Sequence, residues 1–130
     1  MTEDLVCDAS VMVALLTISS AAEPIGRRMR GCSIHVPAHF DAEVLSALGR
    51  LHRARELGAG EVARSLERLA RAPYERHLLG PLLAAAWQRR ENVRLVDALY
   101  IALAVELDAP ILTLDRGLAR STDCAELMRV

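Results

Sequence analysis

The chain has 130 residues, which is the usual size of one compact domain and leaves too little chain for two separate cores. Hydrophobic residues make up 52% of it, and its formal net charge is only -1. Its longest uncharged run, residues 9–22, is too short to cross a bilayer, and the acidic start lacks the positive charge of a signal peptide. We therefore expect a single domain, residues 1–130, in a soluble cytoplasmic protein with no membrane contact.

The composition also suggests partners. The hydrophobic fraction exceeds the roughly 45–50% of ordinary soluble domains, and a face covered by a second copy or a partner would explain the excess. Residues 50–94 contain ten arginines and five glutamates, which gives this part of the chain an excess of positive charge. It could form a surface that binds phosphates, or the arginines could simply lie on solvated helix faces. Three scattered cysteines predict buried free thiols instead of disulfides.

Short apolar strands and helices alternate along the first half of the chain. Residues 4–8 form an apolar run closed by an acid, and a helix is expected over 10–16, with Ser10 as a plausible cap. Further elements are expected as a short helix over 23–29, a strand over 33–36, an amphipathic helix from 39 to a stop at Gly58, and a helix over 60–71 that Pro73 ends.

The second half continues the alternation. It predicts a strand over 74–79, a helix over 81–90, a helix over 95–107, a strand over 111–115, a short helix around Leu118, and a last strand over 127–130. The 95–107 segment is apolar on every side, which is typical of a helix buried by its neighbours. Short apolar strands alternating with helices indicate an α/β fold with a parallel sheet covered on both faces.

Asp97 is an acid inside this apolar segment. An ionised carboxylate on a buried helix costs several kcal/mol unless a partner compensates its charge. The residues leave two partners open, namely an arginine such as Arg94 or a bound cation.

Two more acids, Asp8 and Asp115, directly follow short apolar strands. The ligand site of an open parallel sheet lies beyond the carboxyl ends of its strands, so these side chains are expected to converge. Each alone could be an ordinary turn or cap residue. Together with Asp97 they form a group of like charges, and hard oxygen ligands of this kind suit Mg²⁺ or Mn²⁺.

Four segments in this order resemble the motifs of PIN domains: Val6–Ser10, Pro37–Leu48, Val96–Ala104 and Leu112–Asp115. The resemblance spans nearly the whole chain, and the order and spacing of the segments are more specific than any one of them. It implies a three-layer α/β/α sandwich with a central, mainly parallel sheet of four to five short strands. It also implies a metal-dependent endoribonuclease similar to the VapC-type toxins, which are neutralised by a cognate antitoxin.

The same resemblance assigns roles to residues. It implies Asp8, Glu43, Asp97 and Asp115 as catalytic metal ligands, and Ser10 and Thr113 as supporting hydroxyls. From the residues alone, Glu43 and Asp41 are equal candidates, because both lie near the start of one helix. Arg116 is the nearest candidate for binding RNA phosphates, and an ordinary surface arginine is an equal reading.

Other classes fit less well. All sixteen basic residues are arginine, so the chain lacks the lysine of phospho-receiver domains and of P-loop sites. Pro37 lies between His35 and His39, which argues against a zinc-binding helix. The main alternative is a catalytically degenerate PIN scaffold that only binds RNA or protein. Retention of all four acids argues against it.

Overall fold

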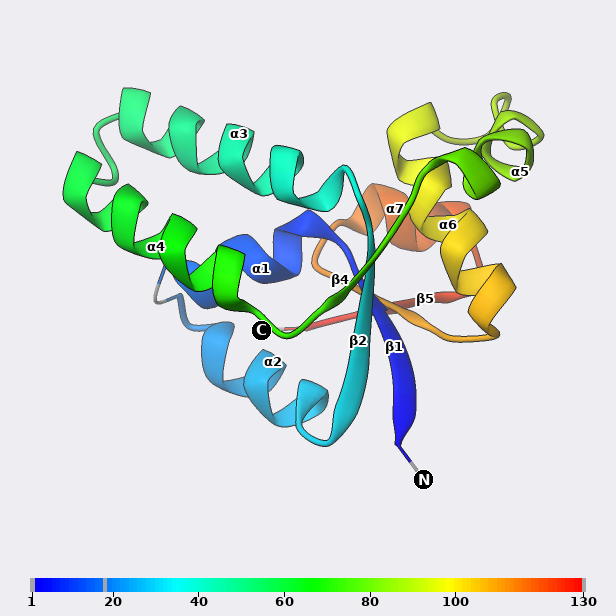
Figure 1. Ribbon diagram of the computed structural model, residues 1–130, viewed down its shortest axis with the longest axis horizontal. Coiled ribbons are helices and arrows are strands. Elements are labelled where there is room, and N and C mark those ends of the chain that lie inside the picture. Colours follow the sequence, from blue (N-terminus) through cyan, green and yellow to red (C-terminus); the bar gives the residue numbers. More distant parts are fainter. Residues whose placement is uncertain (1, 18, 130) are drawn as a thin grey trace.

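The computed structural model describes residues 2–17 and 19–129, which fold into a layered α/β sandwich (Figure 1). Five parallel strands form one sheet in the order β3-β2-β1-β4-β5. The strands are β1 (Glu3–Cys7), β2 (Cys32–Pro37), β3 (Glu75–His77), β4 (Ile111–Thr113) and β5 (Ala125–Leu127).

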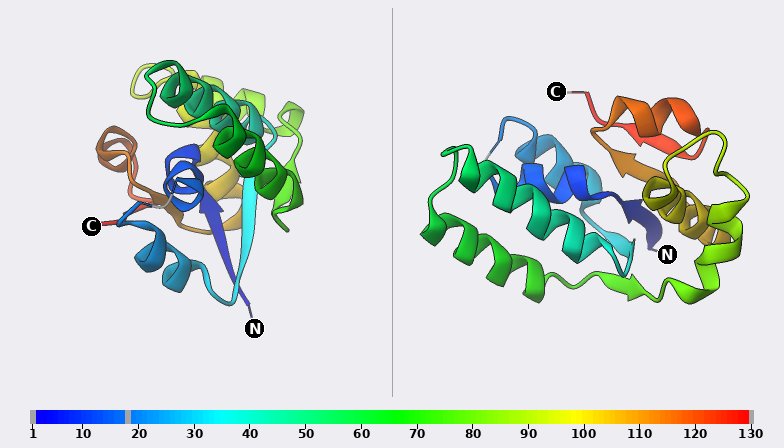
Figure 2. Two further views of the ribbon diagram at one scale, coloured as in Figure 1. Left: turned by 90° about the vertical axis from the view of Figure 1, so that its left-hand side faces the viewer. Right: turned by 90° about the horizontal axis from the view of Figure 1, so that it is seen from above.

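Helices cover the sheet on both sides, with α1 to α4 on one side and α5 and α6 on the other (Figure 2). Helix α7 packs beside β4 and β5. The helices are α1 (Ala9–Leu16), α2 (Ala22–Met29), α3 (Phe40–Arg53), α4 (Ala59–Arg71), α5 (Leu83–Trp87), α6 (Leu95–Leu107) and α7 (Arg116–Ser121), with a 3₁₀ turn at Gly80–Leu82. The expected three-layer fold with a parallel sheet is confirmed.

The apolar segments form the middle of this sandwich. Residues 5–7 of β1 and 111–113 of β4 are all buried, as expected for parallel strands covered on both faces. Residues 98–104 of α6 are buried as well, so this helix lies within the core along most of its length. It ends at Asp108, whose left-handed backbone (φ 50°) turns the chain towards Pro110 and β4.

The strand order creates a crevice between β1 and β4. From β1 the chain moves outward to β2 and β3, then crosses back to place β4 and β5 on the other side of β1. At such a switch point the loops beyond the strand ends diverge and leave room for a ligand. The residues that follow β1 and β4 therefore face the site that the topology favours.

Several local predictions were wrong. The helix expected to stop at Gly58 ends at Arg53, and the Gly58 amide, bonded to Glu61, instead begins α4. The helix expected over 81–90 is a 3₁₀ turn followed by the five residues of α5.

Burial and strand ends also differ from the predictions. The first turn of α6 is not buried, since Leu95 and Val96 are exposed. The last strand covers 125–127 instead of 127–130, and residue 130 lies outside the described residues. Of the three free cysteines, only Cys7 is fully buried.

The helices in the described part of the chain include none with both the length and the apolar character needed to cross a membrane.

Candidate active site

Four carboxylates line one cavity of about 360 Å³ at the crevice between β1 and β4. They belong to Asp8, Glu43, Asp97 and Asp115, and we call this cavity the acid pocket. The acids come from four places: the end of β1, the first turn of α3, the first turn of α6, and the N-cap of α7. The structure thus brings together the four residues that the sequence singled out.

Asp8 lies deepest, with 5% of its surface exposed. Its two carboxylate oxygens each accept a hydrogen bond, from Ser10 Oγ at 2.6 Å and from Thr113 Oγ1 at 2.7 Å. Both hydroxyls are themselves oriented, because Ser10 accepts from the Leu114 amide and Thr113 from the Asp115 amide. This network fixes the Asp8 carboxylate against the end of β4.

Ser10 is not the helix cap that the sequence predicted. It lies within the first turn of α1, and the N-cap is Asp8. The hydroxyl of Ser10 donates to the Asp8 carboxylate instead of capping the helix.

Burial raises the pKa of Asp8 to about 6, and the nearby charge of Asp115 adds to the effect. Hydrogen bonds from the two hydroxyls and from the Val11 amide act in the opposite direction and only partly offset it. A buried carboxylate beside a second carboxylate favours the binding of a cation in the pocket.

Glu43 is held by Tyr100, whose hydroxyl donates to Oε1 at 2.6 Å. Burial and this bond raise the pKa of Tyr100, which therefore remains a donor at neutral pH. Asp41, the rival of Glu43 in the sequence, is outside the pocket, because Arg76 of β3 binds both of its oxygens at 2.7 and 3.0 Å. The structure therefore places Glu43, and not Asp41, in the acid pocket.

Asp97 forms an ion pair with Arg94, whose Nε and Nη2 both lie 2.9 Å from Oδ2. The Arg94 side chain is 72% exposed, whereas that of Asp97 is 14% exposed. The hydrogen bond to Asp97, together with the charges of Asp115 and Glu43, raises the pKa of Arg94. Arg94 is thus the ion-pair partner that the sequence left open, and it leaves Oδ1 of Asp97 without a bond from the described residues.

Asp115 caps α7 and accepts from the amides of Gly117 at 2.8 Å and Leu118 at 3.2 Å through Oδ1. Each of the four acids therefore has its own protein partner. Among the described residues, no three of them bring donor oxygens within 4.8 Å of one another. Carboxylate oxygens are hard donors of the kind that Mg²⁺ or Mn²⁺ prefers, so the chemistry of the set fits such an ion.

Two arginines line the acid pocket, and only one of them, Arg94, was named from the sequence as a partner for an acid. Arg50 of α3 and Arg94 line it, whereas Arg116 lines a neighbouring cavity with Leu114 and residues of the C-terminal segment. Arg50 lies two turns along α3 from Glu43, so its helical spacing was the signal that could have found it.

Comparison with known proteins gives consistent results. The PIN domain family model matches residues 5–122. Ribonuclease VapC3 of Mycobacterium tuberculosis is 48% identical over 120 residues, covering 92% of this chain and 88% of that protein. Ribonuclease VapC12 of the same organism is 34% identical, covering 90% and 91%. The solved structure of a toxin-antitoxin complex from Klebsiella pneumoniae matches with a TM-score of 0.68 at 14% identity, covering 94% of this chain and 95% of that one.

Proposed function

The chain belongs to the PIN domain family, and we propose that it is an endoribonuclease toxin that hydrolyses RNA phosphodiester bonds in the acid pocket. One structural observation carries the proposal: carboxylates from four separate elements line a single cavity at the switch point of a parallel sheet. Relatives named as ribonucleases, matched over most of their length, support the same activity.

We propose that Asp8, Glu43, Asp97 and Asp115 hold Mg²⁺ or Mn²⁺. Their oxygen donors suit these ions, and the positive charge of a bound cation would offset the burial that raises the pKa of Asp8. When bound, the ion would lower the pKa of a water and neutralise charge on the phosphate.

The chain's own residues set the geometry for this chemistry. Ser10 and Thr113 orient the two oxygens of Asp8, and Tyr100 orients Glu43. Carboxylates that are already oriented lose less conformational entropy when they bind a metal ion and substrate, because folding has already fixed their positions. These three hydroxyls therefore act as positioning groups.

Arginines at the rim provide the contacts to RNA. Arg50 and Arg94 line the pocket beside the acids, so a phosphate that enters it can pair with one of their guanidinium groups. Arg116 follows Asp115 at the start of α7 and lines a separate cavity, so we propose that it extends this phosphate-binding surface beyond the acid pocket. Contacts of this kind bind the backbone and carry little sequence information.

We further propose that the toxin pairs with a cognate VapB-like antitoxin in the cytoplasm and that it forms a homodimer. The antitoxin is supported by the similarity to the Klebsiella structure, which is that of a toxin-antitoxin complex. The homodimer is supported by an apolar groove of about 300 Å³ between α5 and α6. Leu83, Trp87, Leu95 and Val96 line it and are each about half exposed, which suits a face covered by a second copy.

Labelled RNA tests the activity and separates it from the degenerate scaffold. The purified protein should cut RNA in millimolar Mg²⁺ or Mn²⁺, lose this activity in excess chelator, and regain it when the metal is restored. Binding of RNA without cleavage under every metal condition would favour the degenerate scaffold instead.

A further inference from the structure

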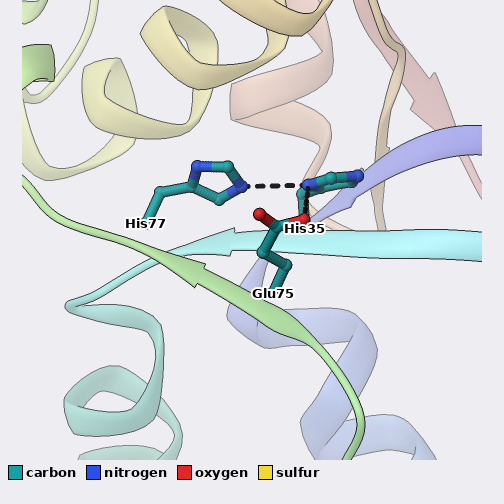
Figure 3. Close-up of side chains that lie close together, drawn as sticks. All are labelled: His35, Glu75 and His77. Carbon is teal, nitrogen blue, oxygen red and sulfur yellow. Dashed lines mark hydrogen bonds and ion pairs between the residues drawn. The ribbon is translucent and has the colours of Figure 1, made fainter.

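A second group of ligand side chains lies where β2 meets the edge strand β3. It consists of His35 on β2 with Glu75 and His77 on β3, and one donor atom of each lies within 4.8 Å of the others (Figure 3). None of the three lines the acid pocket. Among the described residues, no other three His, Cys, Asp or Glu side chains bring their ligand atoms within this distance of one another.

Strand register brings these side chains to one face of the sheet. His35 pairs with Glu75, and Pro37 pairs with His77, in the parallel ladder between β2 and β3. Residues two apart on a strand point to the same face, so Glu75 and His77 both project beside His35. Backbone hydrogen bonding thus fixes the positions from which the three donors extend.

Two of the three distances between donor atoms are close to those of a tetrahedral zinc site. His35 Nδ1 lies 2.9 Å from His77 Nε2 and 3.3 Å from a carboxylate oxygen of Glu75. Zinc–nitrogen bonds of about 2.0–2.1 Å at tetrahedral angles place two ligand atoms about 3.3 Å apart. An ion can therefore be accommodated with only small side-chain movements.

A fourth residue determines which nitrogen of His35 faces this group. The Asp4 carboxylate lies 3.0 Å from His35 Nε2 and can only accept, so Nε2 carries the proton. In the neutral ring, Nδ1 then presents a lone pair towards His77 and Glu75. A carboxylate behind a histidine in this way is the usual outer partner of a zinc-bound imidazole.

From these contacts we propose that His35, Glu75 and His77 form a Zn²⁺ site with Asp4 as its outer carboxylate. Two imidazoles and one carboxylate are ligands that zinc prefers, and a water can complete the fourth position. His35 is buried, whereas Glu75 is exposed, so the ion has both a rigid inner ligand and a path from solvent. This proposal does not rest on the ribonuclease activity.

A zinc ion at this site would link the edge strand β3 to its neighbour β2. β3 has only three residues and pairs with β2 on one side alone. Zinc bound across the two strands would hold β3 in register, together with the segment that leads from it to α5. Because zinc would bind the folded state and not the unfolded one, it should raise the melting temperature.

Zinc titration of the 130-residue chain, first stripped of metal with chelator and then dialysed, tests the proposal by calorimetry and thermal melting. The wild type should bind one zinc ion that His77→Gln does not bind and Glu75→Gln binds more weakly. At a hundredfold excess over the Kd, its melting temperature should rise by roughly 5–10 °C. Asp4→Asn should weaken zinc binding about 10–100-fold.

Two matched variants separate this site from other zinc ligands. His52→Gln removes an exposed histidine elsewhere, and Asp8→Asn disables the acid pocket, so both should keep the zinc response. Co²⁺ in place of zinc should give the intense visible absorption of a four-coordinate ion in the wild type and not in His77→Gln. Melting in chelator checks that each variant is folded.

The proposal is overturned if zinc does not change the melting temperature of the wild type. The contact between His35 and His77 would then be an ordinary hydrogen bond that needs no metal ion. The proposal is also overturned by folded His77→Gln and Glu75→Gln proteins that bind zinc as the wild type does, or by loss of the zinc response in Asp8→Asn alone.

Discussion

Replacing Asp8 with Asn should stabilise the metal-free protein at neutral pH. Asp8 is 5% exposed, and burial raises its pKa from 3.8 to about 6. In the unfolded chain the carboxyl ionises near its ordinary pKa, so the folded state holds the proton more tightly between about pH 4 and pH 6. Stability from this group is therefore present at low pH and is lost as the pH rises through 6.

The size of the effect follows from the shift. At 1.36 kcal/mol for each pKa unit, the ionised Asp8 lowers the free energy of unfolding by about 3 kcal/mol above pH 6. In a domain of this size that is roughly 10 °C in melting temperature. Asn has the shape of the carboxyl but carries no charge, so it should recover part of this loss at neutral pH.

Urea unfolding of both proteins in chelator, at several values between about pH 4 and pH 8, measures the effect. The wild type should become less stable relative to Asp8→Asn as the pH rises, and the difference should level off above about pH 7. A constant difference across this range, or a mutant that is markedly less stable at neutral pH, would refute the argument. Adding Mn²⁺ should stabilise the wild type more than the mutant.

Three further predictions concern the pocket and the groove. Asp97→Asn should change the free energy of unfolding in chelator by no more than about 1 kcal/mol, as measured by urea unfolding, because its arginine partner is mostly exposed. The same change should abolish RNA cleavage in a cleavage assay. Tyr100→Phe should lower kcat about 10-fold without unfolding the protein, since Glu43 loses its hydroxyl donor, and single-turnover kinetics will measure this. Trp87→Glu, in the groove between α5 and α6, should shift the mass in light scattering from dimer to monomer, whereas Val105→Glu, which is equally exposed outside the groove, should not.

The parts of the site that depend on strand ends could be predicted from the sequence. Asp8 and Asp115 each follow a short apolar run, and parallel strands end at the same edge of a sheet, so their proximity follows from the pattern alone. The apolar length of α6 likewise predicted a buried helix that would bring Asp97 to the same region.

Contacts between distant segments could not be predicted in this way. The choice between Glu43 and Asp41 depends on Arg76, which comes from a three-residue strand whose register no local pattern specifies. The same register decides that His77, and not His39, lies beside His35. The exposure of Leu95 and Val96 in the first turn of α6 was not predicted either, because the apolar pattern of the helix runs through that turn unchanged.

The single-turnover cleavage rate of Asp8→Asn in Mn²⁺ tests most directly whether the acid pocket cleaves RNA. Asp108→Asn is the matched control, because it makes the same chemical change at an exposed left-handed position, outside the pocket, that Asn adopts readily. We predict no cleavage by folded Asp8→Asn and wild-type cleavage by Asp108→Asn. Undiminished cleavage by folded Asp8→Asn would contradict the account.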